Sequence, residues 1–275
     1  MTILLGVDGG GSTCRARAVD EDGRLLGEGV SGPANITTDF DGALAAILAA
    51  AGKALDGRDP KDVRAALGLA GANDPAAAQR LQYRLPFQSS RVVTDGHISV
   101  LGALRHQDGI VAAIGTGSIF ILQRGGRQRE IGGKGLVLGD EASGAWIGRK
   151  LLSLTLRALD GFGPMTPLCR ETLDYMGGCP GIISFAARAR PADFAALATR
   201  VTVSDDPVAR AILAEAGDEC TRAVELLQGE LQLPVVVLGG LAAIFAPILS
   251  RRWTVAVPLG AALDGAIQLA GTSLA

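Results

Sequence analysis

One succession of strand, glycine turn, strand, turn and strand occurs twice in this chain, about 105 residues apart. The first copy starts at the apolar run Ile3–Val7 and the second at Gly109–Ile114. Few amino acids are identical between the two copies, but the order of the predicted elements is the same. This spacing is far longer than a solenoid repeat, and it predicts two duplicated domains. The predicted strands of the two copies are 3–7, 14–19, 24–30, 109–114, 118–123 and 128–131.

Strands and helices alternate along the rest of the chain, which predicts an α/β protein with a mixed sheet in each half. We expect an N-terminal domain at 1–107 and a C-terminal domain at 108–275. A final helix at 258–275, opened by Pro258, is a candidate to pack back on the first domain. Further strands are expected at 64–70, 91–94, 234–238 and 253–257, and further helices at 39–55, 75–85, 97–105, 140–159, 166–176, 181–190, 193–199, 206–227 and 241–249.

Composition excludes several classes of protein. A net charge of -2 provides no basic field for nucleic acid or acidic membranes. The four cysteines form no C-x-x-C pair, and with only two histidines a zinc site is not expected. Scattered thiols and an N-terminus without signal-peptide features indicate a cytoplasmic protein. Whether it forms a homodimer is left open.

The segment 231–250 has no charge and approaches membrane-spanning length. Pro234, the pair Gly239-Gly240 and Pro247 interrupt it. These prolines and glycines favour a buried strand, a glycine turn and a helix over a membrane-spanning helix. We therefore expect no membrane association.

Two common nucleotide-binding motifs are missing. No G-x-x-x-x-G-K-[ST] sequence occurs, which excludes a Walker-type phosphate loop. Cys14 stands where the third glycine of a G-x-G-x-x-G motif would follow the first strand, which argues against a nicotinamide site.

Glycine turns of another kind do follow buried strands. Asp8 precedes the turn Gly10, Gly11, Ser12, Thr13, whose amides and hydroxyls suit phosphate oxygens. Asp8 suits Mg²⁺, through water. The turn Gly115, Thr116, Gly117 takes the same place in the second copy, and two such turns could hold the phosphates of one nucleotide from opposite sides. A third cluster, Gly239 and Gly240, suits adenine or ribose. The alternative for each is a glycine turn that binds nothing.

These segments resemble the sugar kinase, heat-shock-protein-70 and actin superfamily. Within it, the chain resembles the glucosamine and N-acetylglucosamine kinase branch of the BadF/BadG/BcrA/BcrD ATPase family. The resemblance implies two duplicated ribonuclease-H-like (actin-like ATPase) domains, with ATP and sugar in a cleft between them. The matching segments are VDGGGST (7–13), PAN (33–35), GLAGAND (68–74), TDG (94–96), IGTGS (114–118), LGDEASGAWIG (138–148) and VLGGLA (237–242).

The resemblance also implies roles for particular residues. Asp95 matches the catalytic base that takes the proton of the sugar hydroxyl; the alternative is an aspartate that caps the helix after it. Thr116 matches a contact to the γ-phosphate or the sugar. Asp140 matches a sugar contact, and its alternative is an acidic residue at the start of a helix. The residues expected near the sugar are Asn35, Gly71, Asn73, Asp95, Thr116, Gly135 and Asp140.

The implied reaction is transfer of the γ-phosphate of ATP, with Mg²⁺, to the 6-hydroxyl of glucosamine or N-acetylglucosamine. One departure concerns the sugar: the branch commonly has Gly-Gly-Trp-Gly where this chain has Lys134 in place of tryptophan. The competing function is that of an ATPase activator of an acyl-CoA reductase or dehydratase, which needs cysteines placed for a bridging [4Fe–4S] cluster. A nucleotide-binding regulatory protein without transferase activity is a third option.

Overall fold

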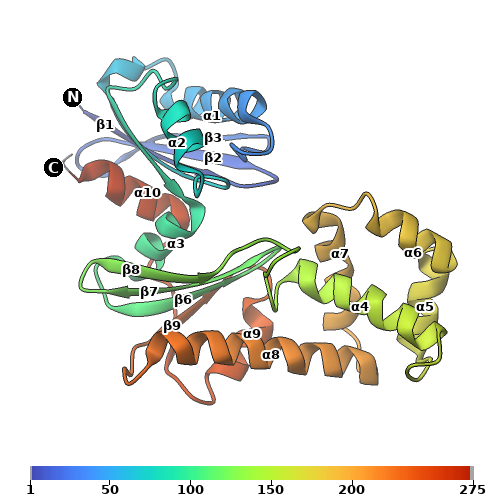
Figure 1. Ribbon diagram of the computed structural model, residues 1–275. Coiled ribbons are helices and arrows are strands. Elements are labelled where there is room, and N and C mark those ends of the chain that lie inside the picture. The colour runs from blue at the N-terminus through green and yellow to red at the C-terminus, as the bar shows by residue number, and fades with distance from the viewer. Residues whose placement is uncertain (1, 273–275) are drawn as a thin grey trace. The chain divides into compact units, whose positions relative to one another are not determined.

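The computed structural model describes residues 2–272 (Figure 1). Over this range the strands form two five-stranded sheets, each in its own compact unit. The first unit runs to Gln107 and resumes at Pro258, and the second comprises Asp108–Val257. The fold is therefore α/β, as the sequence predicts.

Both sheets have the same topology. In the first unit the strand order is β3-β2-β1-β4-β5, and in the second it is β8-β7-β6-β9-β10. In each sheet, the second strand in sequence pairs antiparallel with the first and the third. The fourth strand pairs parallel with the first, and the fifth pairs parallel with the fourth. This is the strand order of a ribonuclease-H-like domain, and it confirms the predicted duplication. The strands are β1 Ile3–Gly9, β2 Cys14–Val19, β3 Leu25–Ser31, β4 Val63–Leu69, β5 Ser89–Thr94, β6 Gly109–Ile114, β7 Ser118–Arg124, β8 Arg127–Gly132, β9 Val235–Leu238 and β10 Val255–Ala256.

Helices cover both faces of the first sheet (Figure 1). Helix α1 (Phe40–Leu55) packs on β2 and β3, whereas α3 (Asp95–Leu104) and α10 (Ala262–Gly271) pack together and α10 covers β1 and β4. The two helices approach closely because Gly102 has no side chain: a Cβ there would lie 2.0 Å from the Ala261 carbonyl oxygen. The other helices of this unit are α2 (Pro75–Gln82) and a short 3-10 turn at Pro60–Asp62.

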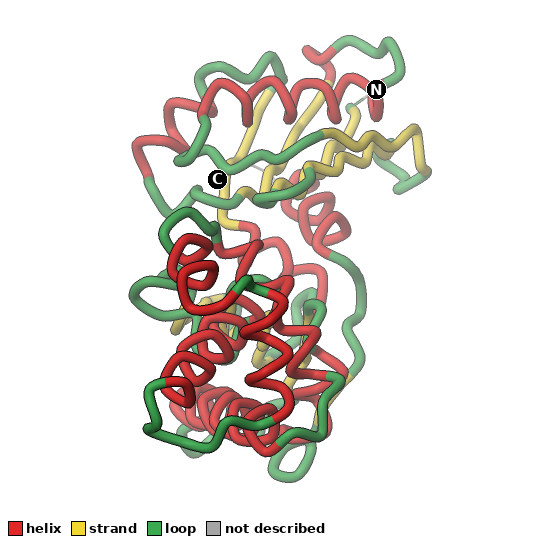
Figure 2. Tube along the Cα trace, turned by 90° about the vertical axis from the view of Figure 1, so that its right-hand side faces the viewer, coloured by secondary structure: helices red, strands yellow, loops and turns green. Residues whose placement is uncertain are grey.

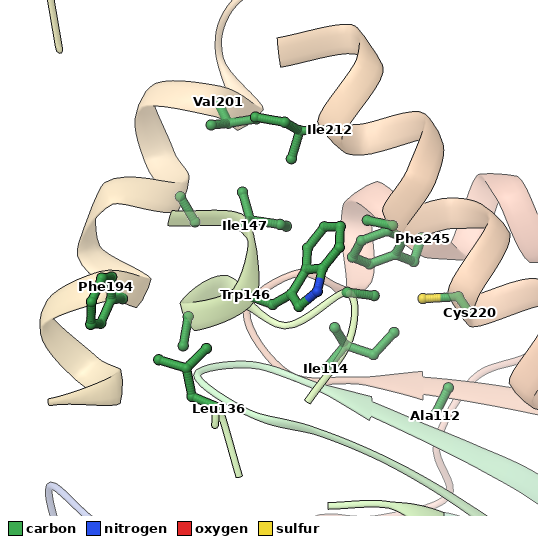
Figure 3. Packing of buried hydrophobic residues seen from close by; sticks show 14 of the residues in the cluster. Ala112, Ile114, Leu136, Trp146, Ile147, Phe194, Val201, Ile212, Cys220 and Phe245 are labelled. Atoms are coloured by element: carbon green, nitrogen blue, oxygen red, sulfur yellow. The ribbon is translucent and has the colours of Figure 1, made fainter. Parts of the chain in front are cut away.

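The second unit carries a helical insertion between β8 and β9, part of the cluster of red helices in Figure 2. The hydrophobic core of the second unit includes Trp146 and Phe245, which lie near each other in Figure 3 with Ile114 beside them. One face of α8 is apolar and buried from Ile212 to Leu227, while Val208 is only partly buried. The helices of this unit are α4 Gly144–Leu159, α5 Pro167–Tyr175, α6 Gly178–Ala186, α7 Pro191–Thr202, α8 Pro207–Gln228 and α9 Ala242–Leu249.

Two predicted helices begin later than expected. Helix α4 begins at Gly144 and not at Asp140, because Asp140 and Ala142 have left-handed backbones, with φ of 58° and 67°. Helix α10 begins at Ala262 and not at Pro258. The preceding segment instead bonds to α3, through the Leu259 amide and the Ala103 carbonyl at 2.9 Å.

The uncharged segment 231–250 forms β9 and α9 with the glycine turn that links them. Within residues 2–272, no helix combines the length and the apolar character needed to cross a bilayer.

Candidate active site

Two carboxylates lie at one edge of the first sheet. Asp8 is near the end of β1, and Asp95 directly follows β5. Strands β1, β4 and β5 are parallel, with Gly9 in register with Leu69 and Leu69 with Thr94. The carboxyl ends of parallel strands meet at a common edge, which is where α/β proteins bind ligands. The structure therefore brings Asp8 and Asp95 together.

The two carboxylates influence each other. Burial raises the pKa of Asp8, and the negative charge of Asp95 raises it further. Burial also raises the pKa of Asp95, against the effect of the Gly96 amide, which donates to its Oδ1 at 2.9 Å. Asp95 nevertheless keeps solvent access. An accessible carboxylate with raised proton affinity suits a general base.

The alternative in which Asp95 caps a helix is wrong. The N-cap of α3 is Thr94, whose hydroxyl accepts a bond from the His97 amide at 3.2 Å. Asp95 is the first residue of the helix, so its carboxylate is not needed as the cap.

Arg15 is a residue that the sequence reasoning missed. It is the direct cross-strand partner of Asp8 in the β1–β2 hairpin, so the two side chains share a face of the sheet. The positive charge of exposed Arg15 lowers the pKa of Asp8 and opposes the effect of burial. The sequence could have indicated this pairing, because Asp8 and Arg15 lie at equal distances on either side of the turn at 10–13.

The first glycine turn is open to solvent. The Gly10 amide donates to the Thr13 carbonyl at 2.9 Å and closes the turn. Gly11, Ser12 and Thr13 are exposed, and a Cβ on Gly11 would meet nothing within 4 Å. The backbone here can approach a phosphate without a side chain in the way.

A loop that contains Asn35 is bonded to the ends of two strands. The Ala34 amide donates to the Gly10 carbonyl at 2.9 Å, and the Ile36 amide donates to the Ala70 carbonyl at 3.1 Å. These bonds place Asn35 against Gly71, where a Cβ would lie 2.8 Å from the Asn35 Oδ1. Gly71 also has φ of +86°, which favours glycine. Asn73 lies exposed in the same turn as Gly71.

In the second unit, Asp140 lies against the second glycine turn. Its Oδ1 accepts a bond from the Gly135 amide at 3.0 Å, and its Oδ2 lies 2.8 Å from the position of a Cβ on Gly117. Thr116, in the same turn, is exposed. The structure thus gathers Thr116, Gly135 and Asp140, three of the residues that the resemblance places near the sugar, beside Gly117 of the predicted phosphate turn.

Asp140 is only 7% exposed, and burial raises its pKa. The negative charge of Glu141 also raises this pKa, whereas the amides of Gly135 and Ser118 lower it. The alternative in which Asp140 starts a helix is wrong, because α4 begins at Gly144 with Ser143 as its cap. Left-handed backbones of this kind cluster at functional sites, so Asp140 is a candidate binding residue.

The third glycine cluster packs on the second. Gly239 has φ of +94°, and a Cβ there would lie 2.3 Å from the Ile114 carbonyl oxygen. The Leu241 amide bonds to that same oxygen at 3.1 Å. The turns at 115–117 and 239–240 are therefore neighbours. Gly240 is exposed, with open space around it.

These contacts give a stability prediction. Gly239→Ala should lower the stability of the second unit by about 1–3 kcal/mol, because the new Cβ meets a backbone oxygen at a left-handed position. Gly240→Ala is the matched control and should leave the thermal midpoint unchanged. Thermal unfolding of both variants tests this, and equal midpoints for the two would contradict it.

The residues present fit ATP and Mg²⁺. Mg²⁺ keeps several waters and is typically held by one or two carboxylates with phosphates. Asp8, with Asp95 beside it, provides such carboxylates. Within residues 2–272 there is no group of three or more side chains that could hold a metal without phosphates and water. Two adjacent carboxylates, of which only Asp8 feels the opposing charge of Arg15, also favour a cation. The three glycine turns provide accessible backbone for phosphates.

Two ribonuclease-H-like units, each with a glycine turn after its first strand, define the actin-like ATPase fold. The chain belongs to the BadF/BadG/BcrA/BcrD ATPase family, whose model matches residues 5–252. It is 31% identical to the glucosamine kinase GspK of Vibrio cholerae, over 98% of this chain and 96% of that protein. The resemblance inferred from the sequence is thus confirmed.

Solved structures agree. A provisionally named N-acetylglucosamine kinase from Chromobacterium violaceum has 33% identity and a TM-score of 0.90, covering 98% of this chain and 99% of its own. A ROK family glucokinase from Streptomyces griseus, solved with glucose and AMPPNP, has 21% identity and a TM-score of 0.62, covering 97% and 98%. The second similarity shows the shared fold.

Proposed function

We propose that this protein is an ATP-dependent amino-sugar kinase, which phosphorylates glucosamine or N-acetylglucosamine at the 6-hydroxyl. The observation that carries the proposal is the accessible Asp95 carboxylate beside Asp8, at the carboxyl edge of the first sheet. Relatives named as glucosamine and N-acetylglucosamine kinases support the choice of substrate.

Asp95 would act as the general base. Its carboxylate accepts the proton of the 6-hydroxyl while that oxygen forms a bond to the γ-phosphorus of ATP. The bond from the γ-phosphorus to the bridging oxygen breaks, and ADP leaves with the electron pair. The raised pKa of Asp95 increases its affinity for that proton.

Asp8 would hold Mg²⁺ through water. When bound, the metal neutralises the charge of the phosphates. The Gly10 and Gly115 amides close their own turns, so the amides at 11–13 and 116–117 would donate to phosphate oxygens, and Gly239 and Gly240 would contact the nucleoside. We propose that the groups of both units serve one reaction.

The sugar would contact Asn35, Asn73, Thr116, Gly135 and Asp140. Asp140 accepts hydrogen bonds when ionised, which suits sugar hydroxyls. Lys134 lies exposed in the loop that also carries Gly135. The loop that contacts Asp140 therefore carries a cation where the branch commonly has tryptophan, and this bears on which amino sugar is preferred.

The cysteines disfavour the activator alternative. Cys14, Cys169 and Cys220 are each 0% exposed and lie on three different elements. Burial raises the pKa of the Cys14 thiol to about 11 and that of Cys220 to about 12. Iron–sulfur clusters require accessible thiolates. Reduced thiols and the use of ATP lead us to place the activity in the cytoplasm.

A substrate panel tests the proposal. We expect ADP release to require sugar, and to be fastest with glucosamine or N-acetylglucosamine and slower with glucose. The 6-deoxy analogue of the preferred sugar is the matched control, because it lacks only the acceptor hydroxyl and should give no stimulation. ADP release that is independent of sugar, or iron in the purified protein, would reject the proposal.

A further inference from the structure

The orientation of the Asn35 amide is fixed by its neighbours. Its Oδ1 accepts hydrogen bonds from the Thr37 amide at 3.0 Å, the Thr37 hydroxyl at 2.8 Å and the Thr38 amide at 3.2 Å. Backbone amides can only donate, so the atom that faces them must be the oxygen of Asn35 and not its nitrogen. The Asn35 side chain therefore has one possible orientation in this loop.

The amide nitrogen of Asn35 has no hydrogen-bond partner among residues 2–272, and the side chain is only half-buried. Its two N–H donors are thus available to a ligand. A donor pair recognises an oxygen acceptor, such as a hydroxyl or an acyl carbonyl. A protonated amine offers only donors, so it does not match this position.

The Thr37 hydroxyl is the side-chain donor in this arrangement. Gly71 leaves room for it, because a Cβ on Gly71 would lie 2.7 Å from the Thr37 Oγ1 and 2.8 Å from the Asn35 Oδ1. The absence of a side chain at Gly71, just after β4, therefore makes room for the side chains of Asn35 and Thr37.

We propose that Thr37 is a positioning residue for substrate specificity: it holds Asn35 so that the amide N–H groups donate to an oxygen of the sugar. This inference rests on the proposed kinase function. It assigns Asn35 the role of a donor to a hydroxyl or acetamido oxygen, and excludes a contact with the ammonium group of glucosamine.

The test is a set of matched variants assayed by ADP release. Thr37→Val removes only the hydroxyl and should raise the KM for the preferred amino sugar about 3- to 10-fold, the effect of one hydrogen bond. The KM for ATP and the thermal midpoint should not change. Thr37→Ser keeps the hydroxyl and should restore the KM. Thr254→Val, at an exposed threonine outside this loop, is the control and should behave as the wild type.

A double-mutant cycle separates positioning from a general structural role. In an Asn35→Ala background, Thr37→Val should raise the sugar KM no further, because there is no amide left to orient. An unchanged KM in Thr37→Val, a failure of Thr37→Ser to restore it, or a full additional effect in the Asn35→Ala background would overturn the inference. If the wild-type protein turns over no amino sugar, both the proposed function and this inference fail.

Discussion

Asp95→Asn should lower kcat by about 10²- to 10⁴-fold, the usual contribution of a general base. Asparagine keeps the size of the side chain and an oxygen that can accept the Gly96 amide, but it cannot accept a proton. The KM for ATP should change little. Steady-state kinetics measure both quantities, and Asp22→Asn, an exposed aspartate in the turn before β3, is the matched control.

The pH profile is a second readout of the same prediction. Because burial raises the pKa of Asp95, the acidic limb of kcat/KM should lie above about pH 3.9, the ordinary aspartate value. Activity should rise with pH as Asp95 loses its proton, since only the ionised form is a base. The residual activity of Asp95→Asn should lose the part of this limb that comes from Asp95, while Asp8 and Asp140, whose pKa values are also raised, continue to titrate. Substantial kcat in the variant, or an unchanged limb, would reject the assignment.

Asp140→Ala should raise the KM for the sugar about 10- to 100-fold, because a hydrogen bond to a charged group is worth roughly 1.5–3 kcal/mol. The KM for ATP should change much less. Part of the effect would come from the loop, since Asp140 also accepts the Gly135 amide at 3.0 Å.

Asp140→Asn separates these two contributions. Asparagine keeps an oxygen for the Gly135 amide but loses the charge and one acceptor. A KM between those of the wild type and Asp140→Ala is expected. Glu141→Gln, which changes the exposed neighbouring carboxylate, is the control and should leave the KM unchanged. An unaltered sugar KM in Asp140→Ala would count against the role of Asp140.

The repeated glycine turns were enough to predict the duplicated fold. A buried strand, a glycine turn and a second strand make a hairpin by local rules, and the same hairpin opens both sheets. The nearness of Asp8 and Asp95 was predictable because Asp8 lies near the end of β1 and Asp95 directly follows β5, two parallel strands of one sheet.

Other features depend on tertiary contacts that local rules do not contain. Asp140 and Ala142 adopt left-handed backbones that their residue types disfavour, so the helix was placed too early. The bond between Leu259 and Ala103 joins segments far apart in sequence, and it delays the start of α10. The orientation of Asn35 likewise depends on contacts that no sequence pattern specifies, with the backbone amides of Thr37 and Thr38 and with the Thr37 hydroxyl.

Helix α10 has a consequence for how this protein is synthesised. It follows the entire second unit in the sequence, yet it covers β1 and β4 of the first, and it packs so closely that a Cβ on Gly6 would lie 3.0 Å from the Leu263 carbonyl oxygen. During translation, the part of this sheet face that α10 covers therefore stays exposed, with only α3 available to pack against β1 and β4, until all of the second unit has been made. The unit that starts first is completed last.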